Sequence, residues 1–180
     1  MAATITLTIA EVPTQPINGL VVSKGGLNFA FANPGQTLFY NSGGPGSVTF
    51  VQDPSIQGSP SPFSIAFSSP VSSIQFGMVG LSLTLIPLAT VQLFNASSVP
   101  FATLPLNATL ADPFAEGLFS FSGGAVTNIA ITPNTNPVRL AFDNLTVVTP
   151  SAVPEPSSLL LMAAGLALVA LKIERRRSIS

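Results

Sequence analysis

The sequence has no cysteine, no histidine and no tryptophan, and it has a single tyrosine. Without cysteine the chain can form neither disulfides nor thiolate metal sites. Without histidine it lacks the commonest general base, the Ser-His-Asp type of triad and the usual ligand of zinc and copper. These absences argue against an enzyme, and we expect the chain to need no cofactor.

Charge is also scarce, because only 7% of the 180 residues are charged, against about 25% in an average soluble domain. Four of the six basic residues lie in the last nine positions, and Lys24 and Arg139 are the only cations before Ser151. The acidic residues before Ser151 are Glu11, Asp53, Asp112, Glu116 and Asp143. Nucleic-acid binding depends on cations that neutralise phosphates, so it is excluded for this part of the chain.

Three unlike segments follow one another at the C-terminus. The first contains a rigid proline pair and consists of Val153, Pro154, Glu155 and Pro156. The second is an uncharged apolar run over residues 159–171, whose main residues are Leu159, Leu160, Leu161, Met162, Gly165, Leu166, Leu168, Val169 and Leu171. The third is basic and contains Lys172, Arg175, Arg176 and Arg177.

The apolar run is typical of a membrane helix. Counted from Ser157 to Ile173 it has seventeen residues, near the lower limit of roughly 17–25 for a bilayer span. Because basic residues stay on the cytoplasmic side, we expect residues 159–180 to form a transmembrane helix with a basic cytoplasmic tail. The body would then lie on the non-cytoplasmic side. The alternative is an amphipathic or buried helix, but the run is apolar on every side.

In this order, the three segments resemble the PEP-CTERM sorting signal of Gram-negative and other envelope-bearing bacteria, which a membrane peptidase called exosortase reads. The resemblance implies that exosortase is the partner and that Pro154, Glu155 and Pro156 are its recognition element. It also implies cleavage near these prolines. The protein would occupy the inner membrane during sorting and then reach the cell surface or the extracellular space.

Proteins sorted in this way normally begin with a basic and apolar secretory signal. Here residues 1–9 alternate threonine with apolar residues, and no cation precedes Lys24. This segment is typical of a β-strand, so we expect a signal peptide upstream of the given start.

Apolar residues recur at every second position along the body, which is the period of a half-buried strand. Such rows are Ile5/Leu7/Ile9, Leu27/Phe29/Phe31, Phe63/Ile65/Phe67, Ile74/Phe76/Met78, Leu81/Leu83/Leu85, Ala89/Val91/Leu93 and Val138/Leu140/Phe142. Turn signals such as Asn33-Pro34-Gly35 and Gly123-Gly124 separate the rows, and no amphipathic helix precedes Ser151. The pattern predicts an all-β antiparallel sandwich or jelly roll over residues 1–148. Pro87 is expected at a strand end, edge or bulge.

Two segments are predicted to be irregular. Residues 55–62 are rich in serine and proline, which is typical of a surface loop. Residues 149–158 are predicted to be a semi-stiff linker, because proline restricts the backbone.

The order of segments also resembles exported bacterial jelly rolls that often precede this sorting tail. Residues 64–76 resemble their strand, Pro-Val turn and strand element, and residues 118–121 resemble their short aromatic strand. Residues 142–147 resemble their closing strand, which carries an Asp-Asn pair. The resemblance implies a lectin-like or carbohydrate-binding sandwich.

Asp143 is the candidate for a metal site, because in related jelly rolls this aspartate can join a structural calcium site. Calcium needs six or more oxygen ligands, and only Glu11 and Asp53 are plausible partners. The favoured interpretation is that Asp143 caps a strand end or accepts a hydrogen bond from a turn.

Asp112 and Glu116 are four residues apart, and paired carboxylates can act as acid and base in glycoside cleavage. The favoured interpretation is a solvated turn around Pro113, with no catalytic residue.

Tyr40 is the candidate ligand-binding residue, because sugar sites use exposed aromatic platforms and Phe39-Tyr40-Asn41 is the only such platform in the sequence. The thirteen phenylalanines fall mostly on the alternating rows and are expected in the core.

The sequence predicts an exported, non-enzymatic surface or extracellular-matrix protein with a structural or adhesive body. Extracellular polysaccharide is a further partner that this body would contact. The alternatives are a carbohydrate- or calcium-binding lectin-like module and, with less support, a hydrolase.

Overall fold

The computed structural model describes residues 2–8, 14–41, 48–81, 87–111, 113–134 and 139–150. Every regular element in these ranges is a strand, and all pairings between strands are antiparallel. The strands are β1 (Ala3–Leu7), β2 (Val21–Lys24), β3 (Leu27–Ala32), β4 (Leu38–Asn41), β5 (Ser55–Gly58), β6 (Phe63–Gly80), β7 (Pro87–Phe94), β8 (Pro100–Asn107), β9 (Thr109–Ala111), β10 (Phe114–Pro133) and β11 (Leu140–Thr149). The predicted antiparallel all-β body is confirmed, and Ala2–Pro150 forms one compact unit.

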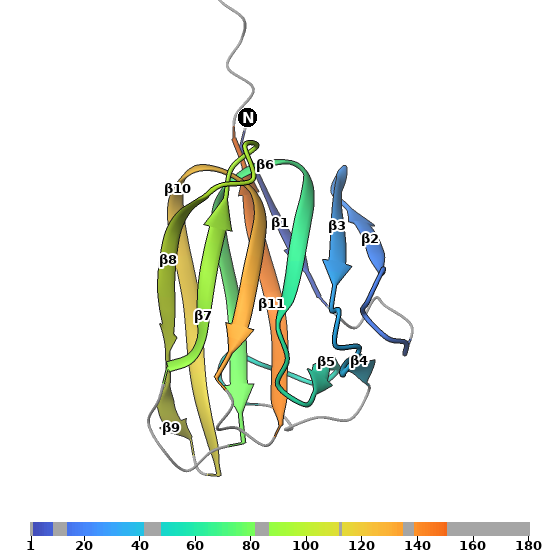
Figure 1. Cartoon of the computed structure of the whole chain (residues 1–180), viewed down its shortest axis with the longest axis vertical. Helices are drawn as coiled ribbons and strands as arrows, with labels where there is room; N and C mark the ends of the chain where they lie inside the picture. The colour runs from blue at the N-terminus through green and yellow to red at the C-terminus, as the bar shows by residue number, and fades with distance from the viewer. Residues whose placement is uncertain are drawn as a thin grey trace, which may run out of the picture. The chain divides into compact units, whose positions relative to one another are not determined.

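The long strands β6 and β10 connect two layers. The first half of β6 pairs with β3 and with the second half of β10, whereas its second half pairs with β11 and with the first half of β10. Between the halves of β10 the register shifts, and Gly123 and Gly124 there have positive φ. Figure 1 shows both strands bending over one end of the body and returning in the other layer.

Each layer therefore consists of its own set of strands. The first layer contains β2, β3, half of β6, half of β10, β7 and β8. The second layer contains β4, β5, β11, the other halves of β6 and β10, and β9, with β1 added to β11. Pro87 begins β7, which confirms the expectation that this proline lies at a strand end.

The alternating rows meet between the layers and form the main core. Phe63 of the first layer packs edge-on against Phe142 of the second, with ring centroids 5.5 Å apart. Phe76 lies 4.9 Å from Phe142 and 4.9 Å from Phe119. Seven of the thirteen phenylalanines are buried: Phe29, Phe31, Phe63, Phe67, Phe76, Phe119 and Phe142. Leu83, Leu85, Ile9 and Val138 of the predicted rows lie outside the described residues.

The prediction of a surface loop over residues 55–62 is wrong for its first half. Residues 55–58 form β5, which lies between β4 and β11, and Ser55, Ile56 and Gln57 are buried. Its polar composition is compatible with burial because the Gln57 amide donates to the Ser55 hydroxyl at 3.0 Å. Gly58 is required where the chain leaves β5, since a Cβ there would collide with the Thr37 carbonyl.

The predicted turn at Asn33-Pro34-Gly35 joins β3 to β4 and is held by a buried amide. The Asn33 carbonyl oxygen Oδ1 accepts the N–H groups of Thr37 at 2.9 Å and Leu38 at 3.0 Å. Its Nδ2 donates to the Ser61 hydroxyl at 2.7 Å and to the Pro62 carbonyl at 3.0 Å. One side chain thus ties the start of β4 to the segment before β6.

Candidate functional site

The outer face of the second layer carries a row of side chains that runs across five strands. Phe39 of β4 pairs with Gln57 of β5, which pairs with Ala141 of β11; Ala141 pairs in turn with Val79 of β6, and Val79 with Glu116 of β10. Directly paired residues of an antiparallel sheet point to the same face. The register therefore brings together residues from separate parts of the sequence on one surface.

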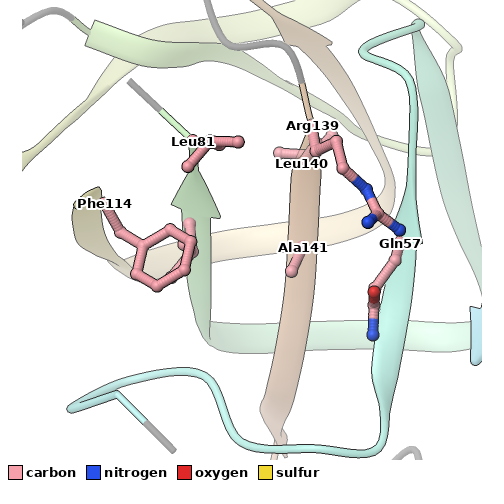
Figure 2. A pocket seen from close by; sticks show the side chains of 7 residues that line it. Gln57, Leu81, Phe114, Arg139, Leu140 and Ala141 are labelled. Atoms are coloured by element: carbon pink, nitrogen blue, oxygen red, sulfur yellow. The ribbon is translucent and has the colours of Figure 1, made fainter. Parts of the chain in front are cut away.

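A pocket of ≈ 240 Å³ opens on this face. It is lined by Gln57, Val79, Leu81, Phe114, Arg139, Leu140 and Ala141. Figure 2 shows Leu81 and Phe114 on one side of the β11 strand and the ends of Arg139 and Gln57 on the other, with Ala141 between them. The pocket therefore has an apolar side and a polar side.

A segment that we call the strap, residues 48–52, is bound to the same face by the Glu116 carboxylate. Glu116 is 2% exposed, and its oxygens accept the backbone N–H groups of Thr49 at 3.1 Å, Phe50, and Val51 at 3.3 Å. Hydrogen bonds to an ionised acceptor are among the stronger ones. One carboxylate therefore satisfies three consecutive amides that no strand pairs.

Two further contacts hold the strap. The Asn144 amide donates to the Phe50 carbonyl at 3.0 Å, and the Asp143 Oδ2 accepts the Gln52 N–H at 3.3 Å. The Phe50 carbonyl approaches β6 so closely that a Cβ at Gly77 would collide with it. These contacts place Val51 on the outer face of the layer.

The strap encloses a small second core beside the pocket. Val51 is fully buried and packs with Val79 and Ala141, and Val48 and Phe114 cover the cluster. Val79, Ala141 and Phe114 also line the pocket. The cluster under the strap and the pocket therefore share these three side chains.

The interpretation of Asp112 and Glu116 as a solvated turn is wrong for Glu116. This residue lies inside β10, paired with Val79 and Thr109, and its carboxylate is buried against the strap. Burial is possible because three N–H groups compensate for the lost hydration. Asp112 lies outside the described residues.

Asp143 is 4% exposed and accepts a hydrogen bond from the strap. Among the described residues, no three side chains of the types that commonly ligate metals come together. Glu11, one of the two expected calcium partners, lies outside these residues. The calcium site remains a prediction.

The expectation that Tyr40 offers an exposed ring is wrong. Tyr40 is 5% exposed, whereas its neighbour Phe39 is 44% exposed. Successive residues of a strand point to opposite faces, so β4 turns Tyr40 into the core and Phe39 outward. The aromatic side chain available to a ligand on this strand is therefore Phe39.

Arg139 and Gln57 are the pocket residues that the sequence pattern did not single out. Arg139 had one signal, because it is one of only two cations before Ser151. Gln57 had none, since its strand was predicted to be a loop. Both reach the pocket only through the pairing of β5 with β11.

The predicted sorting segment, the membrane helix and the basic tail all lie outside the described residues. Within the part of the chain that is described, no helix has the length and apolar character needed to cross a membrane.

Comparison with protein families finds a match to the PEP-CTERM protein-sorting motif at residues 152–177. The matched range contains Val153, Pro154, Glu155 and Pro156, and it continues through Arg177. The chain thus carries a C-terminal PEP-CTERM sorting motif behind an all-β body. No curated protein matches the chain significantly.

Several solved structures resemble the chain at low identity. A mutant family 29 carbohydrate-binding module complexed with mannohexaose is 11% identical over 83% of this chain and 93% of that chain, with a TM-score of 0.45. The cleaved K2 adhesin domain of Lys-gingipain is 9% identical over 81% of this chain and 99% of that chain, with a TM-score of 0.44. At these TM-scores the similarity carries no functional argument.

Proposed function

We propose that the chain is an exported bacterial surface or extracellular-matrix protein that an exosortase-type peptidase sorts and processes. The observation that carries this proposal is the sorting motif at residues 152–177. On this proposal, residues 159–180 hold the chain in the inner membrane, and the β-body lies on the non-cytoplasmic side. Cleavage near Pro154–Pro156 would then release the body to the surface.

The proposed role of the body is structural or adhesive, without catalysis. The absence of histidine and cysteine supports this proposal, because the commonest bases and nucleophiles are missing. The uses of Glu116 and Asp143 support it further, since both carboxylates bind backbone N–H groups of the strap. Buried carboxylates with these hydrogen bonds stabilise the fold.

Sorting is tested with Glu155→Gln in the native host, and Glu174→Gln is the matched control within the same tail. We expect the processed fraction of Glu155→Gln to fall about tenfold, the effect of losing roughly 1.4 kcal/mol of recognition. The control should be processed like the wild type. Immunoblots of membrane, surface and medium fractions measure the ratio, and equal processing of all three proteins would contradict the proposed recognition element.

The alternative proposal is a carbohydrate-binding body, and the exposed ring of Phe39 is the observation that favours it. Phe39 lies in the same row as Gln57, so an aromatic face and an amide are neighbours on the outer surface. Such a pair could stack on a sugar ring and bond to a hydroxyl group.

Binding to the extracellular polysaccharide of the native host tests this alternative. Phe39→Ala is expected to weaken binding about tenfold through the loss of one aromatic contact. Phe101→Ala is the control, because Phe101 is similarly exposed at 43% but lies on β8 of the other layer. If the wild-type protein shows no binding, or if both variants lose it equally, the alternative is wrong.

A further inference from the structure

The proposed sorting route does not involve the pocket between β5, β11, β6 and β10, and the lining of this pocket has a distinct chemistry. We propose that it binds a small amphipathic carboxylate, a molecule with a compact apolar part and one carboxylate group. This inference does not depend on the proposed sorting route, because all seven lining residues belong to the β-body.

The apolar part of the ligand would contact the apolar side of the pocket. Five of the seven lining residues are apolar, namely Val79, Leu81, Phe114, Leu140 and Ala141. Leu81 is 37% exposed in spite of its size. Covering such a side chain with an apolar group is favourable, at about 25 cal/mol for each Å² removed from water.

The carboxylate would contact Arg139 on the polar side. Arg139 is one of the two cations before Ser151. Within the described part of the chain, no ion pair engages its guanidinium, which Figure 2 shows extending toward Gln57. A guanidinium binds a carboxylate through two parallel hydrogen bonds. Gln57 donates one amide hydrogen to Ser55 at 3.0 Å, and its amide nitrogen has a second hydrogen for the ligand.

The size of the pocket limits the apolar part to about one ring with a short linker. An apolar cavity of about 150 Å³ is large enough for benzene, and pockets for drug-sized ligands start at roughly 300 Å³. A pocket of ≈ 240 Å³ lies between these sizes. Phenylpropionate, with a phenyl ring, a two-carbon linker and a carboxylate, fits this range.

A free sugar fits the same lining less well. A sugar ring carries several hydroxyl groups, and each hydroxyl that is buried without a partner costs free energy. Among the described residues, the polar side chains that line the pocket are those of Gln57 and Arg139. An uncharged ligand would therefore gain no ion pair with the guanidinium, and a strongly polar ligand would leave hydroxyl groups of its own without partners.

The test is a titration of the full chain, held in zwitterionic nanodiscs, with phenylpropionate and with its neutral analogue phenylpropanol. Methyl NMR signals of Val79, Leu81 and Ala141 report on the pocket, and those of Val91 and Ile129 in the main core serve as a reference. We expect phenylpropionate to shift only the pocket signals, with a dissociation constant on the order of 1 mM. Phenylpropanol should bind about tenfold more weakly, because it cannot pair with the guanidinium.

Three substitutions make the test specific. Arg139→Gln should remove the preference for phenylpropionate over phenylpropanol, whereas Lys24→Gln, which removes the other cation of the body, should leave it unchanged. Leu81→Ser should weaken both ligands severalfold. The proposal is overturned if phenylpropionate shifts no pocket signal at about 20 mM, which is 20-fold the expected dissociation constant. It is also overturned if Arg139→Gln still binds phenylpropionate more tightly than phenylpropanol, or if a uronic acid binds the pocket instead of phenylpropionate.

Discussion

Replacing Glu116 with alanine is expected to lower the free energy of unfolding by about 4 kcal/mol, the range measured when one partner of a buried charged interaction is removed. The reason is that the N–H groups of Thr49, Phe50 and Val51 would lose their common acceptor. The strap would then open, and Val51 would leave the apolar cluster that it forms with Val79 and Ala141.

Denaturant unfolding and amide hydrogen exchange measure this effect separately. The amides of Thr49, Phe50 and Val51 should exchange about a thousandfold faster in Glu116→Ala, which corresponds to about 4 kcal/mol of local opening. Gly77→Ala provides an independent perturbation, because its Cβ would displace the Phe50 carbonyl without touching the carboxylate.

Glu116→Gln is the conservative control. Its remaining carbonyl oxygen can still accept hydrogen bonds, so we expect roughly half the loss of stability seen with alanine. Unchanged strap exchange in Glu116→Ala would contradict the assignment of this carboxylate as the anchor of the strap.

Asn33→Ala is expected to lower the free energy of unfolding by about 3 kcal/mol and the melting temperature by roughly 10 °C. Four hydrogen bonds of this fully buried side chain would be lost. The N–H groups of Thr37 and Leu38 would be left without their side-chain acceptor at the start of β4. Each buried group without a partner costs about 1–3 kcal/mol.

Asn28→Ala is the matched control for Asn33. Asn28 lies on the same strand, β3, but it is exposed, and its amide oxygen accepts a hydrogen bond from the Ser23 hydroxyl at 2.7 Å. Exposed substitutions usually change stability by less than about 0.5 kcal/mol. Thermal melts of the two variants should therefore differ by several degrees, and equal melts would show that the buried amide does not hold the turn.

The all-β architecture could be predicted from local sequence alone. Alternating rows such as Phe63/Ile65/Phe67 and Ala89/Val91/Leu93 are buried on one side because a strand repeats every two residues. The bending of β6 and β10 could not be predicted in the same way. Gly123-Gly124 was visible as a turn signal, but only the partner strands decide that the chain bends there and continues in another layer.

The roles of individual polar residues were harder to predict, because they depend on contacts between distant parts of the sequence. Glu116 binds the strap residue Thr49, which lies 67 residues away in the sequence. The residues next to Glu116 in the sequence suggest an exposed carboxylate beside a proline. They do not indicate that its carboxylate accepts hydrogen bonds from three backbone amides. Tyr40 and Phe39 illustrate a smaller error, since one position along a strand exchanges the buried face for the exposed one.

The sorting motif is the opposite case, because its three segments are adjacent in the sequence and each has a direct physical meaning. Prolines stop a helix from starting earlier, an apolar run enters a bilayer, and basic residues stay on the cytoplasmic side. The expected resemblance agrees with the family match over residues 152–177. The function of the tail is therefore more accessible from the sequence than that of the body.

The most direct test of the proposed sorting is the intact mass of the protein in the native host, measured separately for the membrane, surface and medium fractions. The proposal predicts that the surface and medium forms end near Pro154–Pro156 and lack the apolar run. If the protein instead retains residues 159–180 and is found only in the membrane fraction, the tail is a permanent anchor and processing by exosortase is contradicted.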